Sequence, residues 1–398
     1  MADIAAPKLE DSQDSWLVYA DALQSAGDPR GELIMLNQAV EAGASAAARD
    51  AFLDRHADAI FGELARFRGQ VEIDWKWCVP RSLSLKIGPR DEPLALAKAS
   101  LSSPLGAQMQ TLRLVALTPS QSDRVNLVPA LLELSKGLST NCTALELIDD
   151  RARRSRILVS SDYSPSNNLV DFGNLNTIWA IPQLQRVHLV VADTEQVKLG
   201  QIDAPELRDF AFLGLRWGQP YRDQSEMAQT LAAAKWPKLQ RLALRIPETY
   251  TYSWPDQDGA YVSVDRYDEE GDDEYMDDEG WHEDMNWSAE LGGLLDALLQ
   301  TKLEQLSLTS FASASNLLVA LAEHGLPASL QILDLSASDL GDEAVGWMLE
   351  HRQLFASLKT LDLRDTLIDD ASPLAALGPE VLHSSGGGAI YRFSVGME

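Results

Sequence analysis

Three segments near the C-terminal end of the sequence share the pattern Leu-x-x-Leu-x-Leu. They begin at Leu303, Leu330 and Leu358, so successive copies start 27 and 28 residues apart. A Leu-x-Leu pair alternates as a β-strand does, which places both leucines on one face and the residue between them on the other. One unit of this length cannot bury its own apolar face, so neighbouring units have to stack. The pattern therefore predicts repeated strands that lie side by side in a parallel sheet.

Weaker copies extend the pattern toward the N-terminus, 23 to 64 residues apart, which indicates inserted loops. The additional residues expected to point inward are Leu239, Leu242 and Leu244; Leu184, Val187 and Leu189; Cys142, Leu145 and Leu147; Met109, Leu112 and Leu114; and, least regular, Leu207, Phe210 and Phe212, and Pro80, Leu83 and Leu85. The segments resemble leucine-rich repeats of the longer, helix-containing kind over roughly residues 80 to 370, with Ser338 and Thr366 at the usual asparagine position. The resemblance implies an α/β solenoid with a parallel sheet on the concave side and helices outside. An ordinary α/β domain with leucine-rich strands is the alternative.

The segments between the strands predict returning helices. Residues Trp287–Lys302 place five leucines on one helical face. Ser315–His324 and Gly341–Phe355 have the same character. Asp223–Glu226 is typical of a capping box at a helix start.

The first seventy residues follow a different pattern. Leu17–Asn37 predicts two helices, with Gly27 ending the first and Asp28-Pro29 starting the second. This stretch, with its L-x-YAD-x-L and GDPRGE cores and the later Arg55-His56-Ala57-Asp58, resembles the small bacterial repeat-companion domain, although Ala22 and Met35 replace a usual tryptophan and arginine. That family has no established chemistry, so the resemblance implies an N-terminal helical cap and a bacterial origin.

These patterns divide the chain into four parts. Residues 1–72 form the expected cap, 73–380 the repeat array, and 381–398 a loop with a closing strand at Ala389–Val395. The fourth part, residues 247–286, interrupts the array and is called the acidic insertion below.

The acidic insertion combines charge with aromatic rings. From Asp256 to Asp284 it has fourteen acidic residues and one basic residue. Exposed aromatic rings are typical of binding surfaces, so the residues expected to contact a partner are Tyr261, Asp268, Asp272, Tyr275 and Trp281. A solvated loop is the alternative. The carboxylate spacing does not match an EF-hand, which leaves only a loose cation site as a further alternative.

The residues between the inward leucines should line the concave face. They include Lys86, Arg113, Arg186, His188, Arg241, Arg245, Gln305, Ser307, Thr309, Asp334, Ser336, Asp362 and Arg364. Of these, the expected partner-binding residues are Arg186, His188, Arg241, Arg245, Asp334, Asp362 and Arg364. The middle of this face is therefore predicted to be basic. We expect the acidic insertion to fold over it and pair with Arg186, Arg241 and Arg245; the alternative is that these arginines are simply solvated.

Charge and composition narrow the classes of partner. With 60 acidic and 33 basic side chains the formal net charge is -27, which disfavours nucleic acid or anionic lipid and favours a basic protein. Two cysteines cannot form a disulfide framework. No secretory signal or membrane-length apolar run is evident, so the expected location is the cytoplasm.

No segment carries a recognisable catalytic motif. The six histidines are scattered without metal-ligand spacing, and there is no P-loop or G-x-S-x-G sequence. His282 is the one weak candidate for a metal ligand. The sequence therefore predicts a non-catalytic protein-binding module with no cofactor and no metal. Two alternatives are an inhibitor or immunity-type protein that neutralises a basic effector, and a hydrolase or ligase whose site the sequence does not reveal.

Overall fold

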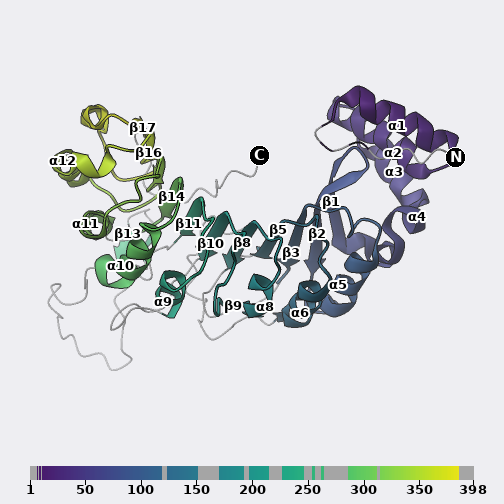
Figure 1. The fold of residues 1–398 in the computed structure, drawn as a ribbon, viewed down its shortest axis with the longest axis horizontal. Coiled ribbons are helices and arrows are strands. Elements are labelled where there is room, and N and C mark those ends of the chain that lie inside the picture. The colour runs from purple at the N-terminus through teal and green to yellow at the C-terminus, as the bar shows by residue number, and fades with distance from the viewer. Residues whose placement is uncertain are drawn as a thin grey trace. The chain divides into compact units, whose positions relative to one another are not determined.

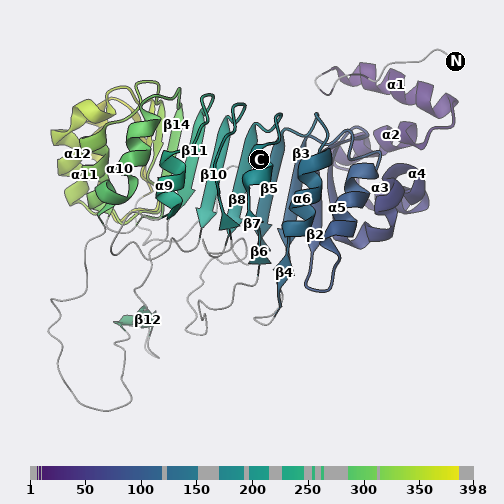
Figure 2. The same cartoon turned by 60° about the horizontal axis from the view of Figure 1, so that its bottom comes forward.

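A computed structural model describes residues 7, 9, 11–118, 123–150, 170–191, 197–214, 226–245, 253–255, 261–263, 286–311 and 314–384. The chain divides into two compact units. The first unit comprises Met1–Asp150 and Leu169–Val187, and the second comprises Arg151–Asn168 and His188–Glu398. The boundary between the two units falls within strand β8 (Arg186–Val191), between Val187 and His188. Figures 1 and 2 show the helices and strands of both units.

The first unit begins with the predicted helix pair, α1 (Gln13–Ser25) and α2 (Pro29–Glu41). Gly27 has φ +72, and the Asp28 side chain accepts a hydrogen bond from Arg30 N. This is the expected combination of a glycine stop and an aspartate N-cap. A Cβ built at Gly31 would lie 2.6 Å from the carbonyl oxygen of Ala20, so the two helices approach too closely there for a larger residue.

Short helices lead from this pair into the sheet of the first unit. They are α3 (Ala47–Arg55), α4 (Ala57–Phe61) and the 3-10 segment η1 (Gly62–Gln70). The buried Trp16 ring of α1 stacks on Trp77, with centroids 5.8 Å apart.

The sheet of the first unit has the strand order β1-β2-β3-β5. Its strands are β1 (Val71–Lys76), β2 (Val79–Ile87), β3 (Thr111–Ala116) and β5 (Ala144–Asp149). β1 pairs antiparallel with β2, and the following pairs are parallel. The connecting helices α5 (Pro93–Ser102) and α6 (Val128–Gly137) lie side by side against the strands (Figure 2). The unit also contains β4 (Val125–Asn126), β6 (Val170–Asp171), β7 (Gly173–Asn174) and α8 (Asn176–Trp179).

The second unit repeats the same strand-and-helix arrangement. After β9 (Val197–Lys198), its parallel strands are β10 (Asp209–Gly214), β11 (Arg241–Arg245), β14 (Gln305–Thr309), β15 (Ile332–Asp334), β16 (Thr360–Asp362) and β17 (Glu380–Leu382). Its helices are α9 (Glu226–Ala232), α10 (Trp287–Leu298), α11 (Ala314–His324), α12 (Glu343–Glu350), η3 (Arg352–Phe355) and η4 (Ser372–Leu377). Within the acidic insertion, β12 (Ser253–Pro255) and β13 (Tyr261–Ser263) pair antiparallel.

The leucine pattern builds the core of both units. Pairing places Leu83 beside Leu112 and Leu112 beside Leu145 in the first unit. In the second unit one row runs through Phe210, Leu242, Leu306, Leu333 and Leu361. All the predicted inward triplets are buried, including the two least regular ones. The predicted α/β arrangement, with a parallel sheet and helices between its strands, is therefore confirmed.

Two polar residues complete the turns of the last repeats. Ser338 Oγ accepts a hydrogen bond from Phe311 N at 3.1 Å, and Thr366 Oγ1 donates to Leu363 O at 2.8 Å. Both side chains are buried, so each satisfies backbone groups that would otherwise be unpaired.

The structure refines several predicted boundaries. α10 ends at Leu298 rather than Lys302, and β1 crosses the expected boundary after residue 72. The predicted strand Ala389–Val395 lies outside the described residues, as does Asp223 of the predicted capping box.

Candidate functional site

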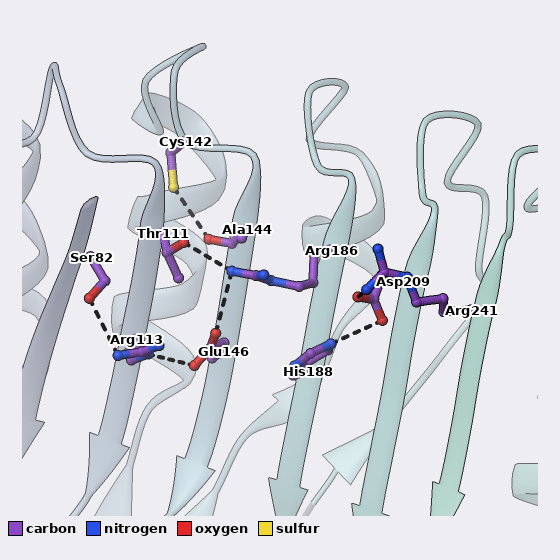
Figure 3. A network of polar contacts seen from close by, with 10 residues as sticks. All are labelled: Ser82, Thr111, Arg113, Cys142, Ala144, Glu146, Arg186, His188, Asp209 and Arg241. Carbon is purple, nitrogen blue, oxygen red and sulfur yellow. Dashed lines mark hydrogen bonds and ion pairs between the residues drawn. The ribbon is translucent and has the colours of Figure 1, made fainter. Parts of the chain in front are cut away.

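Two arginines share one buried carboxylate on the outward face of the first unit. Arg113 Nε donates to Glu146 Oε2 at 2.6 Å, and Arg186 Nη2 lies 3.7 Å from Glu146 Oε1 (Figure 3). The Glu146 side chain is 4% exposed, whereas those of Arg113 and Arg186 are 30% and 38% exposed. We call these residues the Arg113–Glu146–Arg186 cluster.

Strand register positions this cluster. Arg113 on β3 pairs with Glu146 on β5, and Arg186 N donates to Thr143 O just before β5. Neighbouring hydroxyls hold the guanidinium groups, because Arg113 Nη1 donates to Ser82 Oγ at 3.3 Å and Arg186 Nη2 to Thr111 Oγ1 at 3.1 Å. Each arginine is thus fixed by more than its ion pair.

A groove of about 510 Å³ adjoins the cluster in the same unit. Arg49, Arg68 and Arg113 line it, together with Ser82 and Ser84 from β2. Two of these arginines have carboxylate partners of their own: Arg49 with Asp50 at 2.9 Å, and Arg68 with Asp54 at 3.8 Å. Asp50, Glu72 and Asp74 also line the groove, so its three guanidinium groups are matched by three carboxylates.

A second ion-paired group lies on the outward face of the second unit. His188 Nε2 is 3.1 Å from Asp209 Oδ1, and Arg241 Nη1 is 3.7 Å from Asp209 Oδ2 (Figure 3). Asp209 precedes the inward Phe210 as Arg241 precedes Leu242, so the shared register places the two side chains next to each other. The Arg241 side chain is 62% exposed.

The third group lies at the ends of β15 and β16: Asp334 and Asp362 are the last residues of these strands, and Arg364 follows β16. Arg364 Nη2 is 2.5 Å from Asp362 Oδ2, and this contact raises the pKa of Arg364. Burial raises the pKa of Asp334, against hydrogen bonds from Ser336 that lower it, and the nearby Asp362 raises it further. The predicted trio Asp334, Asp362 and Arg364 thus forms one contact group, in which Arg364 is the most exposed member.

The structure corrects the prediction that the middle of the face is simply basic. Glu146 and Asp209 supply carboxylates to the predicted Arg186, His188 and Arg241. Both acids stand at outward positions beside inward residues of the repeat, so the same register could have identified them. Arg245 was expected to be open to a partner, but it is only 7% exposed.

Most of the residues expected to contact a partner from the acidic insertion lie outside the described residues. The backbone of Tyr261 belongs to β13, whereas Asp268, Asp272, Tyr275 and Trp281 lie outside the described residues, as does His282. The predicted pairing of the insertion with Arg186, Arg241 and Arg245 also falls outside the described part of the chain.

A serine, a histidine and an aspartate meet between α10 and α11, which the sequence did not suggest. Ser288 Oγ lies 3.1 Å from His324 Nε2, and His324 Nδ1 lies 2.9 Å from Asp296 Oδ1. Ser288 Oγ also donates to Glu323, so its single proton is not directed at the ring. A hydroxyl that donates its proton to a carboxylate is not oriented to pass that proton to the ring, as a nucleophile–base pair requires. The Asp296 side chain is 63% exposed, which further favours a helix-to-helix network over a nucleophilic site.

The thiols and metal-ligating groups of the described residues show no reactive arrangement. Burial raises the pKa of both Cys78 and Cys142 to about 11. A thiol of that pKa is almost wholly protonated near neutral pH and is a poor nucleophile. Within the described ranges no group of three or more His, Cys, Asp or Glu residues is placed to hold a metal ion. Nor does any helix in those ranges have the length and apolar character needed to cross a membrane.

Comparisons with known proteins extend only to the fold. No protein-family model matches the chain, and no curated protein matches it. A Bacteroides fragilis protein solved by a structural-genomics consortium is similar in fold, with 13% identity and a TM-score of 0.50 over 74% of this chain and 71% of that one. An internalin from Listeria monocytogenes aligns over 77% of this chain and 87% of its own at 12% identity. Its TM-score of 0.26 is too low to indicate a shared fold. The first likeness supports the α/β fold and says nothing about activity.

Proposed function

We propose that the chain is a non-catalytic leucine-rich-repeat solenoid that binds another protein through the outward face of its strands. Residues 1–72 act as its N-terminal cap, of the repeat-companion type, and the two buried free thiols suit a reducing cytoplasm. The repeating register gives every strand an outward side chain beside its neighbour's, which is how such arrays present a binding surface.

One observation carries this proposal. Charged side chains on and just after the strands form ion pairs within each group, yet the arginines of these pairs remain accessible. The Arg241 and Arg364 side chains are 62% and 52% exposed, while their carboxylate partners Asp209 and Asp362 are 19% and 8% exposed. Arginine anchored in this way loses little side-chain freedom on binding and is a frequent contributor to interface affinity.

Charge reversal tests the proposal. Intact chain, Arg186→Glu, Arg241→Glu and Arg364→Glu are used as baits in the cells that naturally make the protein, and retained proteins are quantified. Lys136→Glu is the matched control, because Lys136 is on α6 and 71% exposed. We expect a protein that the intact chain and the control retain and at least one face variant loses. Equal retention by all baits would contradict binding through this face.

A second candidate function is inhibition of a basic effector by the acidic insertion. It rests on the fourteen acidic residues between Asp256 and Asp284 and on the aromatic residues among them. In this case, deletion of Asp256–Asp284 would leave folding intact and abolish capture. Capture by the intact chain would also weaken strongly between low and high salt, because exposed charges are screened. A partner captured equally well without the segment would exclude this candidate and leave the strand face as the binding surface.

A further inference from the structure

We propose that Arg113 and Arg186 form a carboxylate-binding site that receives an aspartate or glutamate side chain of the partner protein. This inference rests on the proposed function and specifies the chemistry of its partner. It differs from the expectation of a basic partner, which follows from the net charge alone.

The Arg113–Glu146–Arg186 cluster has more positive than negative charge. Arg113 and Arg186 both pair with Glu146, and the contacts among the described residues give neither arginine a second carboxylate. One carboxylate therefore faces two guanidinium ions. The other cations on the outward side of the same unit pair one to one: Arg81 with Asp74 at 3.0 Å, and Lys86 with Glu72.

The two arginines also have N–H groups that form no hydrogen bond within the described residues. Arg113 uses Nε and Nη1, and Arg186 uses Nη2. Among the described residues no acceptor is bonded to Nη2 of Arg113 or to Nη1 of Arg186, and Nε of Arg186 is buried without one. Guanidinium N–H groups form strong, charge-assisted hydrogen bonds to carboxylates, so an incoming carboxylate would satisfy Nη2 of Arg113 and Nη1 of Arg186, which Glu146 leaves unused. The buried Nε of Arg186 is not within its reach.

Both arginines are also accessible to a partner from solvent. Glu146 is almost fully buried, so it positions the two arginines from beneath while their outer atoms reach solvent. Arg113 also lines the groove of about 510 Å³, so a segment bound there would reach this member of the cluster. The other lining arginines, Arg49 and Arg68, are matched by the lining carboxylates of Asp50, Glu72 and Asp74. A partner segment lying in this groove could therefore direct an acidic side chain at the cluster.

Charge also decides which anion is recognised. A nucleic acid presents one phosphate after another and needs many cations along its length. This chain has a net charge of -27, which disfavours a polyanion as the partner. A single carboxylate on a protein requires only the two arginines observed, which favours an acidic side chain over a phosphate backbone.

Selection from a displayed library of random peptides tests the site, using the full chain as bait. We expect the intact chain to enrich peptides with Asp or Glu at a fixed position. Arg113→Gln/Arg186→Gln should bind synthetic copies of those peptides at least about tenfold more weakly. Lys136→Gln is the matched control, since Lys136 lies on α6, away from the outward strand face, and is 71% exposed.

Two further measurements distinguish a misfolded double variant from a wrong assignment of the carboxylate-binding site. Arg186→Gln alone leaves the 2.6 Å contact between Arg113 and Glu146 in place, so it tests the site if the double variant does not fold. In the intact chain, the side-chain N–H signals of Arg113 and Arg186 should shift on peptide addition. Enriched peptides without acidic preference, or with affinity unchanged in the variants, would overturn the site alone. Peptides that bind without depending on any outward residue would overturn the proposed function as well.

Discussion

The imidazole of His324 occupies the space where a side chain at position 292 would begin. A Cβ built on Gly292 would lie 2.6 Å from both Cε1 and Nε2 of that ring. Gly292 is inside α10, where glycine ordinarily costs about 1 kcal/mol relative to alanine. The glycine therefore allows the two helices to meet with the ring between them.

Gly292→Ala should consequently destabilise the protein in spite of its better helix propensity. Gly346→Ala in α12 is the matched control, because nothing lies within 4 Å of its built Cβ, and it should gain about 0.5–1 kcal/mol. The measurement is the urea midpoint of each variant. Adding His324→Ala to Gly292→Ala should recover part of the loss, and a stabilised Gly292→Ala would show that the ring does not rest there.

Removing the shared carboxylate should weaken the first unit. Glu146→Gln leaves the charges of Arg113 and Arg186 facing each other without compensation, which we expect to cost about 2 kcal/mol in free energy of unfolding. Glu133→Gln, which breaks an i,i+3 pair with Lys136 on α6, should cost less than about 0.5 kcal/mol. Denaturant unfolding compares the two, and similar losses would argue against a structural role for Glu146.

Asp28 should contribute stability that disappears in acid. The hydrogen bond from the Arg30 side chain holds the pKa of Asp28 below its ordinary value of 3.8. A lowered folded pKa means that the contribution is complete above about pH 4 and is lost as the pH falls through the folded pKa. The stability difference between the natural chain and Asp28→Asn should therefore shrink below pH 4. A difference independent of pH would contradict the ion pair.

The stability contribution of Asp334 should depend on pH in the opposite direction to that of Asp28. Burial raises its pKa above 3.8, so the folded state favours the protonated form. Stability from this group is fully present below pH 3.8 and declines as the pH rises through the folded pKa. Asp334→Asn should therefore gain on the natural chain between pH 4 and pH 7, as measured by urea midpoints. A loss over that range would show that hydrogen bonding to Ser336 outweighs burial.

Both thiols should resist labelling until the protein unfolds. Cys78 and Cys142 are 7% and 0% exposed, and burial raises the pKa of each to about 11. At pH 7.5 we expect very slow reaction with a thiol reagent in buffer and complete reaction in denaturant. Fast labelling of either cysteine in the native protein would indicate local opening around it.

The sequence predicts the inward residues well because, within each copy, buried and outward residues alternate as in a strand, whatever the length of the loops between copies. Leu83 and Phe210 belong to the weakest copies of the pattern, yet both are buried in register with their neighbours. Tight turns were also predictable from local chemistry, as Gly27 and Asp28 show.

Contacts on the outward face were less predictable, because they depend on which strands are neighbours. Glu146 and Asp209 could have been found by applying the same register to acidic residues as to arginines. The burial of Arg245 and the meeting of Ser288 with His324 could not, since they depend on how side chains and helices pack in three dimensions.

Strands β11 and β14 pair directly, Leu244 beside Leu308, although the whole acidic insertion separates them along the chain. Two strands can therefore pair in the sheet even when a long segment separates them in the sequence, provided that the chain re-enters the sheet in the same register. This junction is a natural splice point: a reporter domain or an epitope exchanged for the segment would leave the leucine ladder on either side undisturbed.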